Sequence, residues 1–222
     1  GDQAQWLQEG MQCILSMFNG QCVALDTFTA GVLAWGWQEI SLYTGFVTGP
    51  RKHRCAEGCS GWRHFGHAIG VNLWHEVAII AVAAVITFLS WGSENQWGLW
   101  SYLLLWVMHL SARLNVFLGV RNVSEEFVPA HMEVLKSFLT RKPMNLLFPI
   151  SVTGGTVGAV LLFQLAFSAS DPGDVAGFSL LAALASLEVA VLGTFGFQPG
   201  DLFFALLEPT VDGELHVLLD GL

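Results

Sequence analysis

Charged residues are scarce in this sequence. Only 12% of its 222 residues are Asp, Glu, Lys or Arg, whereas 53% are hydrophobic. Soluble domains carry roughly a quarter charged residues. This composition, with a mean hydropathy of +0.54, therefore indicates a membrane protein. Basic residues are rarer than acidic ones, nine against eighteen. The resulting formal net charge of −9 excludes nucleic acid as an expected partner.

Cysteine is also scarce, and the common catalytic sequence motifs are missing. Four cysteines are too few for a disulfide scaffold, so we expect helix packing within lipid to hold the fold. The opening residues, GDQAQWLQEG, have no initiating Met and no signal-peptide pattern, and we expect a fragment or a processed start. The sequence contains no nucleophile elbow, phosphate loop, HExxH helix or Rossmann glycine pattern, so no motif indicates an enzyme.

Long hydrophobic runs, by contrast, are abundant. A helix needs about 20 apolar residues to cross a hydrocarbon core of about 30 Å. Segments of that length lie at residues 28–48, 71–91, 97–120, 145–167 and 175–197. Their apolar residues run continuously rather than alternating as in barrel strands. We therefore predict an all-α, polytopic transmembrane bundle of about five helices over residues 28–197, with an outer N-terminal segment (1–27) and an acidic C-terminal tail (198–222).

The basic residues predict the orientation of this bundle. Eight of the nine lie in two connections, between the first and second and between the third and fourth runs. The positive-inside rule places both connections in the cytoplasm. The second connection contains residues 124–139, for which we predict an amphipathic surface helix. Its apolar face would carry Phe127, Val134, Leu135 and Phe138, turned toward lipid, the bundle or a docking partner.

Six ionisable residues fall inside the apolar runs: Glu39, His75, Glu76, His109, Arg113 and Glu188. Each costs roughly 2.5–3.5 kcal/mol on insertion scales and requires a partner or a role. One interpretation is an ion-paired network in which Arg113 neutralises Glu39, Glu76 or Glu188, with Glu76 closest in depth. A second makes His75 or His109 an axial ligand of a tetrapyrrole metal, with His109 favoured by depth. A third is a carboxylate-rich metal site formed by His75, Glu76, Glu39 and Glu188, although the adjacent side chains of His75 and Glu76 point about 100° apart on a helix.

Glycines in the fourth run predict close helix packing. Gly154 and Gly158 have the small-xxx-small spacing that lets two membrane helices approach closely.

Three blocks of the sequence resemble one known family. They are LSARLNVFLGVRNVSEEFVPAHMEVLKSFLTRKPMNLLFPISVT at residues 110–153, AWGWQEISLYTGFVTGPRK at residues 34–52 and WHEVAI at residues 74–79. These blocks resemble the photosynthetic complex assembly proteins typified by PuhE, from anoxygenic phototrophic bacteria. The resemblance covers about residues 28–192, and family members carry further hydrophobic helices before this point.

The resemblance implies a multi-pass factor of the bacterial inner, photosynthetic membrane that assists assembly of the photosynthetic reaction centre and its core antenna. It implies reaction-centre or core-antenna subunits, bacteriochlorophyll, or both, as partners. If bacteriochlorophyll is bound directly, its candidate ligands are the two imidazoles within the apolar runs, His109 and His75. The competing interpretation is a membrane-embedded enzyme or regulator of bacteriochlorophyll metabolism.

Overall fold

A computed structural model of the chain describes residues 24–54, 61–121, 133–139 and 145–196. Every regular element in these ranges is a helix: α2 (Ala24–Tyr43), α3 (Gly61–Leu89), α4 (Trp97–Leu118), α5 (Glu133–Lys136), α6 (Leu147–Ser168) and α7 (Pro172–Gly196). The predicted all-α membrane bundle is thereby confirmed.

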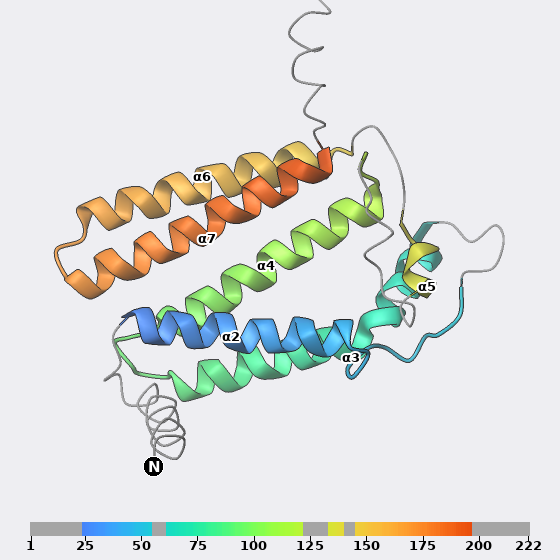
Figure 1. Cartoon of the computed structure of the whole chain (residues 1–222), viewed down its shortest axis with the longest axis horizontal. Helices are drawn as coiled ribbons and strands as arrows, with labels where there is room; N and C mark the ends of the chain where they lie inside the picture. Colours follow the sequence, from blue (N-terminus) through green and yellow to red (C-terminus); the bar gives the residue numbers. More distant parts are fainter. Residues whose placement is uncertain (1–23, 55–60, 122–132, 140–144, 197–222) are drawn as a thin grey trace, which may run out of the picture.

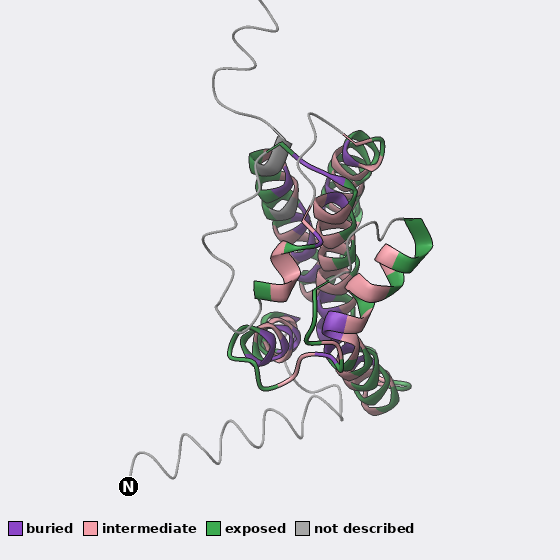
Figure 2. Ribbon diagram, turned by 90° about the vertical axis from the view of Figure 1, so that its right-hand side faces the viewer, coloured by how far each residue is buried: buried purple, intermediate pink, exposed green. Residues whose placement is uncertain are grey.

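The long helices are arranged in two groups. Figure 1 shows α6 and α7 side by side as an antiparallel hairpin, α2 and α3 side by side on the opposite edge, and α4 between the two groups. Buried residues lie on the faces that the helices turn toward one another, and exposed residues lie on the outer faces (Figure 2). Because α4 is central, its side chains can meet groups from both edges of the bundle.

Four of the five predicted crossings are confirmed by length and apolar composition. The helices concerned are Gly61–Leu89, Trp97–Leu118, Leu147–Ser168 and Pro172–Thr194. The first predicted crossing also forms a helix, α2, but this helix is less apolar than the others and is not among the four candidates. Its polar residues include Gln38, which is 1% exposed and donates from Nε2 to the Ala78 carbonyl at 3.2 Å. The polar side of α2 is thus used for contact within the bundle.

Small residues bring α2 and α4 together. Gly31 of α2 lies against α4 so closely that a Cβ there would collide with Ser101 and with the backbone of Gly98. The Ser101 hydroxyl donates to the Phe28 carbonyl at 3.2 Å across the same crossing. In membranes, close backbone approach of this kind replaces the hydrophobic driving force that is missing between helices in lipid.

The glycine prediction for α6 is corrected by one residue. Gly155 faces α7, because a Cβ there would meet Val189 Cγ2 at 2.7 Å. Added Cβ atoms at Gly154 and Gly158 would meet no atom of the described residues within 4 Å. Spacing identifies residues that share a helix face, but it does not identify which face the neighbouring helix covers.

The two basic connections meet at one end of the bundle. Arg54, in the connection after α2, lies 3.8 Å from Glu133 of α5 (Nη2 to Oε2). Phe138, after α5, packs on the His64 ring of α3 with 4.9 Å between ring centroids. This common end is what the predicted orientation requires of both connections.

Only residues 133–139 of the predicted surface helix (residues 124–139) are described, and the helix α5 covers four of them. Residues 122–132, which include Phe127, lie outside the described residues, and helix α5 ends at Lys136. From Ser137 to Leu139 the backbone amides donate to carbonyls three residues earlier, and the Ser137 hydroxyl donates to the Val134 carbonyl at 2.7 Å. This tight turn ends the helix. Val134 and Leu135 are half-buried, whereas Phe138 is buried against α3.

Candidate functional site

The central site is prepared by a break in α3. Asn72 has φ −122° and ψ 16°, so two helical segments meet there at a kink. The backbone groups released at the kink are bonded by the connection that follows α2: the His75 amide donates to the Thr48 carbonyl at 3.0 Å, and the Arg51 amide donates to the Gly70 carbonyl at 3.1 Å. Non-helical backbone at membrane depth requires such replacement partners.

Glycine permits this contact. Gly49 lies directly on Gly70 and Val71, and a Cβ at Gly49 would collide with the backbone of both. The kink therefore begins a new helical segment at a fixed place, with Asn72, His75 and Glu76 in its first turns. Residues spaced by three and four share one face of a helix, so Asn72, His75 and Glu76 can all be directed toward α4 and α2.

Three groups from three helices converge next to this kink. Glu39 of α2 places its Oε1 atom 3.6 Å from His75 Nε2 of α3 and 3.3 Å from His109 Nδ1 of α4. One carboxylate oxygen and one nitrogen from each imidazole all lie within 4.8 Å of one another. His75 is fully buried, and the side chains of Glu39 and His109 are 22% and 15% exposed. The three residues have the ligand types and the proximity needed to hold a metal ion.

A second carboxylate neutralises the nearby guanidinium. Arg113 of α4 pairs with Glu76 Oε1 of α3, the carboxylate that the depth comparison favoured. With its amide oriented so that the oxygen faces the guanidinium, Asn72 accepts a hydrogen bond from Arg113 Nη2 and donates to the Val71 carbonyl at 3.2 Å. The guanidinium is thereby held by the kink as well as by Glu76.

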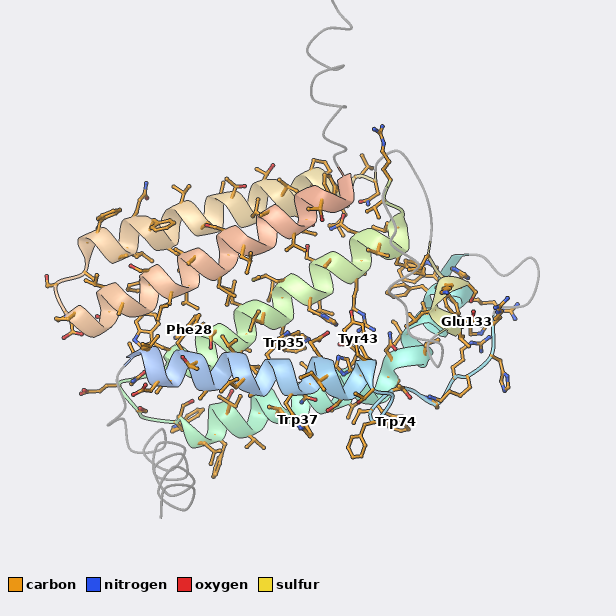
Figure 3. The ribbon with its side chains drawn as sticks, viewed as in Figure 1. Phe28, Trp35, Trp37, Tyr43, Trp74 and Glu133 are labelled. Atoms are coloured by element: carbon orange, nitrogen blue, oxygen red, sulfur yellow. The ribbon has the colours of Figure 1, made fainter. Side chains whose placement is uncertain are left out.

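Aromatic side chains enclose the cluster on one side. The Trp35 ring stands edge-on to the His109 ring at 5.3 Å and to the Tyr102 ring at 5.6 Å. Tyr102 is fully buried and donates from its hydroxyl to the Ile79 carbonyl at 3.2 Å. Figure 3 shows Trp35 on the side of α2 toward α4, whereas Trp37 lies on an outer face and is 58% exposed. Trp35, Ile79, Ala83 and Tyr102 form a buried apolar core beside the polar groups.

The structure thus brings together five of the six ionisable residues identified within the apolar runs. Glu188 belongs to α7 by its backbone, but its side chain lies outside the described residues, so its predicted membership of the network stays a prediction.

Sequence reasoning missed the combination of Glu39 with both histidines. At a rise of about 1.5 Å per residue, Glu39 and His109 lie at nearly equal depth, about 16 and about 18 Å from the predicted outer ends of their runs. This was a usable signal for the pair. Sequence reasoning also missed Asn72, whose spacing from His75 and Glu76 gave the corresponding signal on α3.

The space beside the histidine nitrogens is limited for the predicted binding of a pigment. A tetrapyrrole needs an open face above the ligating nitrogen, but His75 Nε2 faces Glu39 at 3.6 Å and His109 Nε2 faces Glu76 at 4.0 Å. A macrocycle could reach either nitrogen only if the three helices separated there. Ligation of bacteriochlorophyll by His109 or His75 stays a prediction.

Comparisons with known proteins assign the chain to a family. The family model described as "Protein of unknown function (DUF3623)" matches residues 15–193. A relative from Rhodobacter capsulatus, described as an uncharacterized 30.4 kDa protein in the puhA 5′ region, is 35% identical over 160 residues. The match covers 72% of this chain and 58% of that relative, so this chain spans little more than half of the relative's length. No solved structure matches. Because the family model covers most of the sequence, including every described helix but the last few residues of α7, the chain is a member of the DUF3623 family.

Proposed function

We propose that this chain is an integral inner-membrane factor of phototrophic bacteria that assists assembly of the photosynthetic reaction centre and its core antenna. The observation that carries the proposal is the 35% identity over 160 residues to a protein in the puhA 5′ region. This position supports a role connected with photosynthesis. The resemblance of residues 110–153 to assembly proteins of the PuhE type supplies the finer assignment.

The fold supports handling of other membrane proteins. Large apolar side chains lie on the outer faces of several helices, where lipid or the helices of a partner can contact them. They include Trp37 of α2, Trp74 and Phe88 of α3, and Phe163 of α6. We propose that partner subunits pack on these outer faces, while the polar cluster holds α2, α3 and α4 together.

The proposal is tested in the bacterium that carries the chain. Inactivation of the gene is expected to lower the near-infrared absorption of assembled reaction centre and core antenna, while pigment and subunits are still synthesised. Complementation with the unaltered gene should restore assembly. Normal amounts of both complexes in the inactivated strain, at every stage of growth under phototrophic conditions, would contradict the proposal.

The docking role of the second basic connection needs a variant chosen from the structure. Phe138 is 2% exposed, so Phe138→Asp would bury a charge and disturb the fold itself. Leu135→Glu changes a half-buried position and is the sharper substitution. If this face contacts a subunit, Leu135→Glu should lower complex assembly without lowering the amount of the protein in the membrane. Lys136→Gln, on the same short helix, is the matched control.

Direct pigment binding is a separate part of the proposal. The unaltered protein, purified from pigment-producing cells, should then show bacteriochlorophyll absorption that His109→Leu removes. His109 is the better candidate because its side chain is 15% exposed, whereas His75 has no exposure. If no pigment is found above background, the proposal is restricted to the handling of apoproteins.

A second candidate function is a membrane enzyme or regulator of bacteriochlorophyll metabolism. The grouping of Glu39, His75 and His109 favours it, because such a site can bind a metal and act on a substrate. The two functions differ in the inactivated strain. An enzyme of pigment metabolism should leave a pigment precursor that accumulates, whereas an assembly factor should leave finished pigment that is not incorporated into complexes.

A further inference from the structure

The polar atoms at the centre of the site lack hydrogen-bond partners. Within the described residues, both ring nitrogens of His75, Nε2 of His109 and Oε1 of Glu39 are buried and make no hydrogen bond of acceptable geometry. Buried polar groups in proteins are nearly always hydrogen-bonded, and a bound ion is one of the explanations for a group that is not. These atoms come from three different helices and lie close together, so the missing hydrogen bonds are not confined to one pair of residues.

The distances between these atoms fit the edges of a metal coordination shell. Zinc bound at about 2.0–2.1 Å by nitrogen and carboxylate oxygen in a tetrahedral arrangement separates its ligand atoms by about 3.3–3.4 Å. Glu39 Oε1 lies 3.3 Å from His109 Nδ1 and 3.6 Å from His75 Nε2. The ligating nitrogens of the two imidazoles lie within 4.8 Å of one another, and we expect this third edge to shorten when an ion binds.

We infer that Glu39, His75 and His109 bind one divalent first-row transition-metal ion between α2, α3 and α4. Two imidazoles and one carboxylate form the ligand set of zinc sites with an open position and of non-haem iron(II) sites. The class of ligand is therefore Zn²⁺ or Fe²⁺, with the remaining positions open to water or a substrate. The inference goes beyond the proposed assembly role and is independent of it.

The charges around the site suit a cation. Arg113 forms its ion pair with Glu76, and the two charges neutralise one another. The guanidinium therefore does not serve as the ion-pair partner of Glu39. Glu39 keeps its formal negative charge next to two imidazoles that can bind a metal in their neutral form. A divalent ion supplies the partner that a carboxylate at this depth requires.

Glu76 is the expected outer partner of one ligand. When Nδ1 of His109 binds the ion, its Nε2 carries the proton. Glu76 Oε1 lies 4.0 Å from that nitrogen, beyond hydrogen-bond distance, so it has to move closer to accept from it. A carboxylate on the far ring nitrogen fixes the tautomer and orientation of metal-binding histidines. The break in α3 fixes the other ligand, because the His75 amide is bonded to Thr48 outside the helix.

The test measures metal binding by the full chain, purified in detergent with a histidine-free affinity tag. After removal of metal with a chelator, the protein is dialysed against Zn²⁺ or Co²⁺, and bound metal is counted by mass spectrometry. We expect one equivalent per chain, visible absorption bands from bound Co²⁺, and loss of both in Glu39→Gln and His109→Gln. His53→Asn, in an exposed connection, should bind metal as the unaltered chain does.

Two further variants distinguish the metal ligands from their neighbours. Glu39→Asp should restore part of the binding that Glu39→Gln loses, and Glu76→Gln should keep one equivalent with an affinity lowered by no more than about 100-fold. Helicity and gel filtration check that each variant is folded, so the fully buried His75 need not carry the test. The inference is overturned if the unaltered chain retains neither metal. It is equally overturned if folded Glu39→Gln or His109→Gln binds as much as the unaltered chain.

Discussion

Arg113 is the residue on which the polar cluster depends for charge balance. Replacing it with Leu leaves Glu76 without its partner at membrane depth, whereas replacing both with Leu removes the unpaired charge. We expect Arg113→Leu to lower the free energy of unfolding by about 2–3 kcal/mol, somewhat less than the about 3–5 kcal/mol of fully buried pairs, because both side chains keep some exposure. Thermal unfolding in detergent measures the effect.

The double variant, Glu76→Leu with Arg113→Leu, is the control for this prediction. It should recover most of the lost stability, since apolar side chains can replace an ion pair at little cost. If the double variant were as unstable as the sum of the two single variants, the two residues would not be coupled in the way that the structure shows.

The crossing of α2 and α4 is tested by two glycines on the same helix. A Cβ at Gly31 collides with α4, whereas a Cβ at Gly36 meets nothing within 4 Å in the described part of the chain. Gly31→Ala should therefore lower stability by about 1–3 kcal/mol through overpacking. Gly36→Ala should be neutral or stabilise by up to about 1 kcal/mol, because alanine favours the helix. Equal melting temperatures for the two variants would contradict the packing of α2 on α4.

The break in α3 is tested through its contact with the preceding connection. Gly49→Ala should push the connection away from Gly70 and Val71, so that the His75 amide loses its acceptor, Thr48. We expect faster hydrogen exchange in the peptide that contains residues 70–76, measured by mass spectrometry. Gly66→Ala, at an open position of the same helix, should leave the exchange of this peptide unchanged.

At the scale of the whole molecule, the predicted topology places four chain positions on two sides of the membrane. Arg54 and Glu133 meet at one end of the bundle, whereas Glu94 and Asp171 lie in the two connections at the other end. In a background without native cysteines, single cysteines at these positions should react with an impermeant maleimide in two groups. Arg54→Cys and Glu133→Cys should label only in inside-out vesicles.

Labelling of Arg54→Cys and Glu94→Cys from the same side would contradict this topology. The connecting helix α3 could not then span the membrane. Helix α3 has 29 residues and a break at Asn72, so this control tests whether the helix crosses the membrane in spite of the break.

The sequence alone determined much of the local structure and part of the site. Continuous apolar runs determined the four long helices that can cross a membrane, because a lipid environment requires backbone hydrogen bonds within each segment. Depth along the helices was enough to match Arg113 with Glu76, because two residues at equal depth on facing helices can meet. The three blocks that resemble PuhE-type proteins, within residues 34–153, all lie in the part of the chain that matches DUF3623.

Only the tertiary structure decided which faces of these helices meet. It grouped Glu39 with His75 and His109, selected Gly155 rather than Gly154 or Gly158 for the contact with α7, and turned Phe138 inward onto His64. Periodicity shows which residues share a face, but the rotation and offset of each helix follow from packing against all of its neighbours. The break at Asn72 changes the rotation of half of α3 and depends on a connection bonded to it from outside, so no pattern within the helix alone could place His75 in the site.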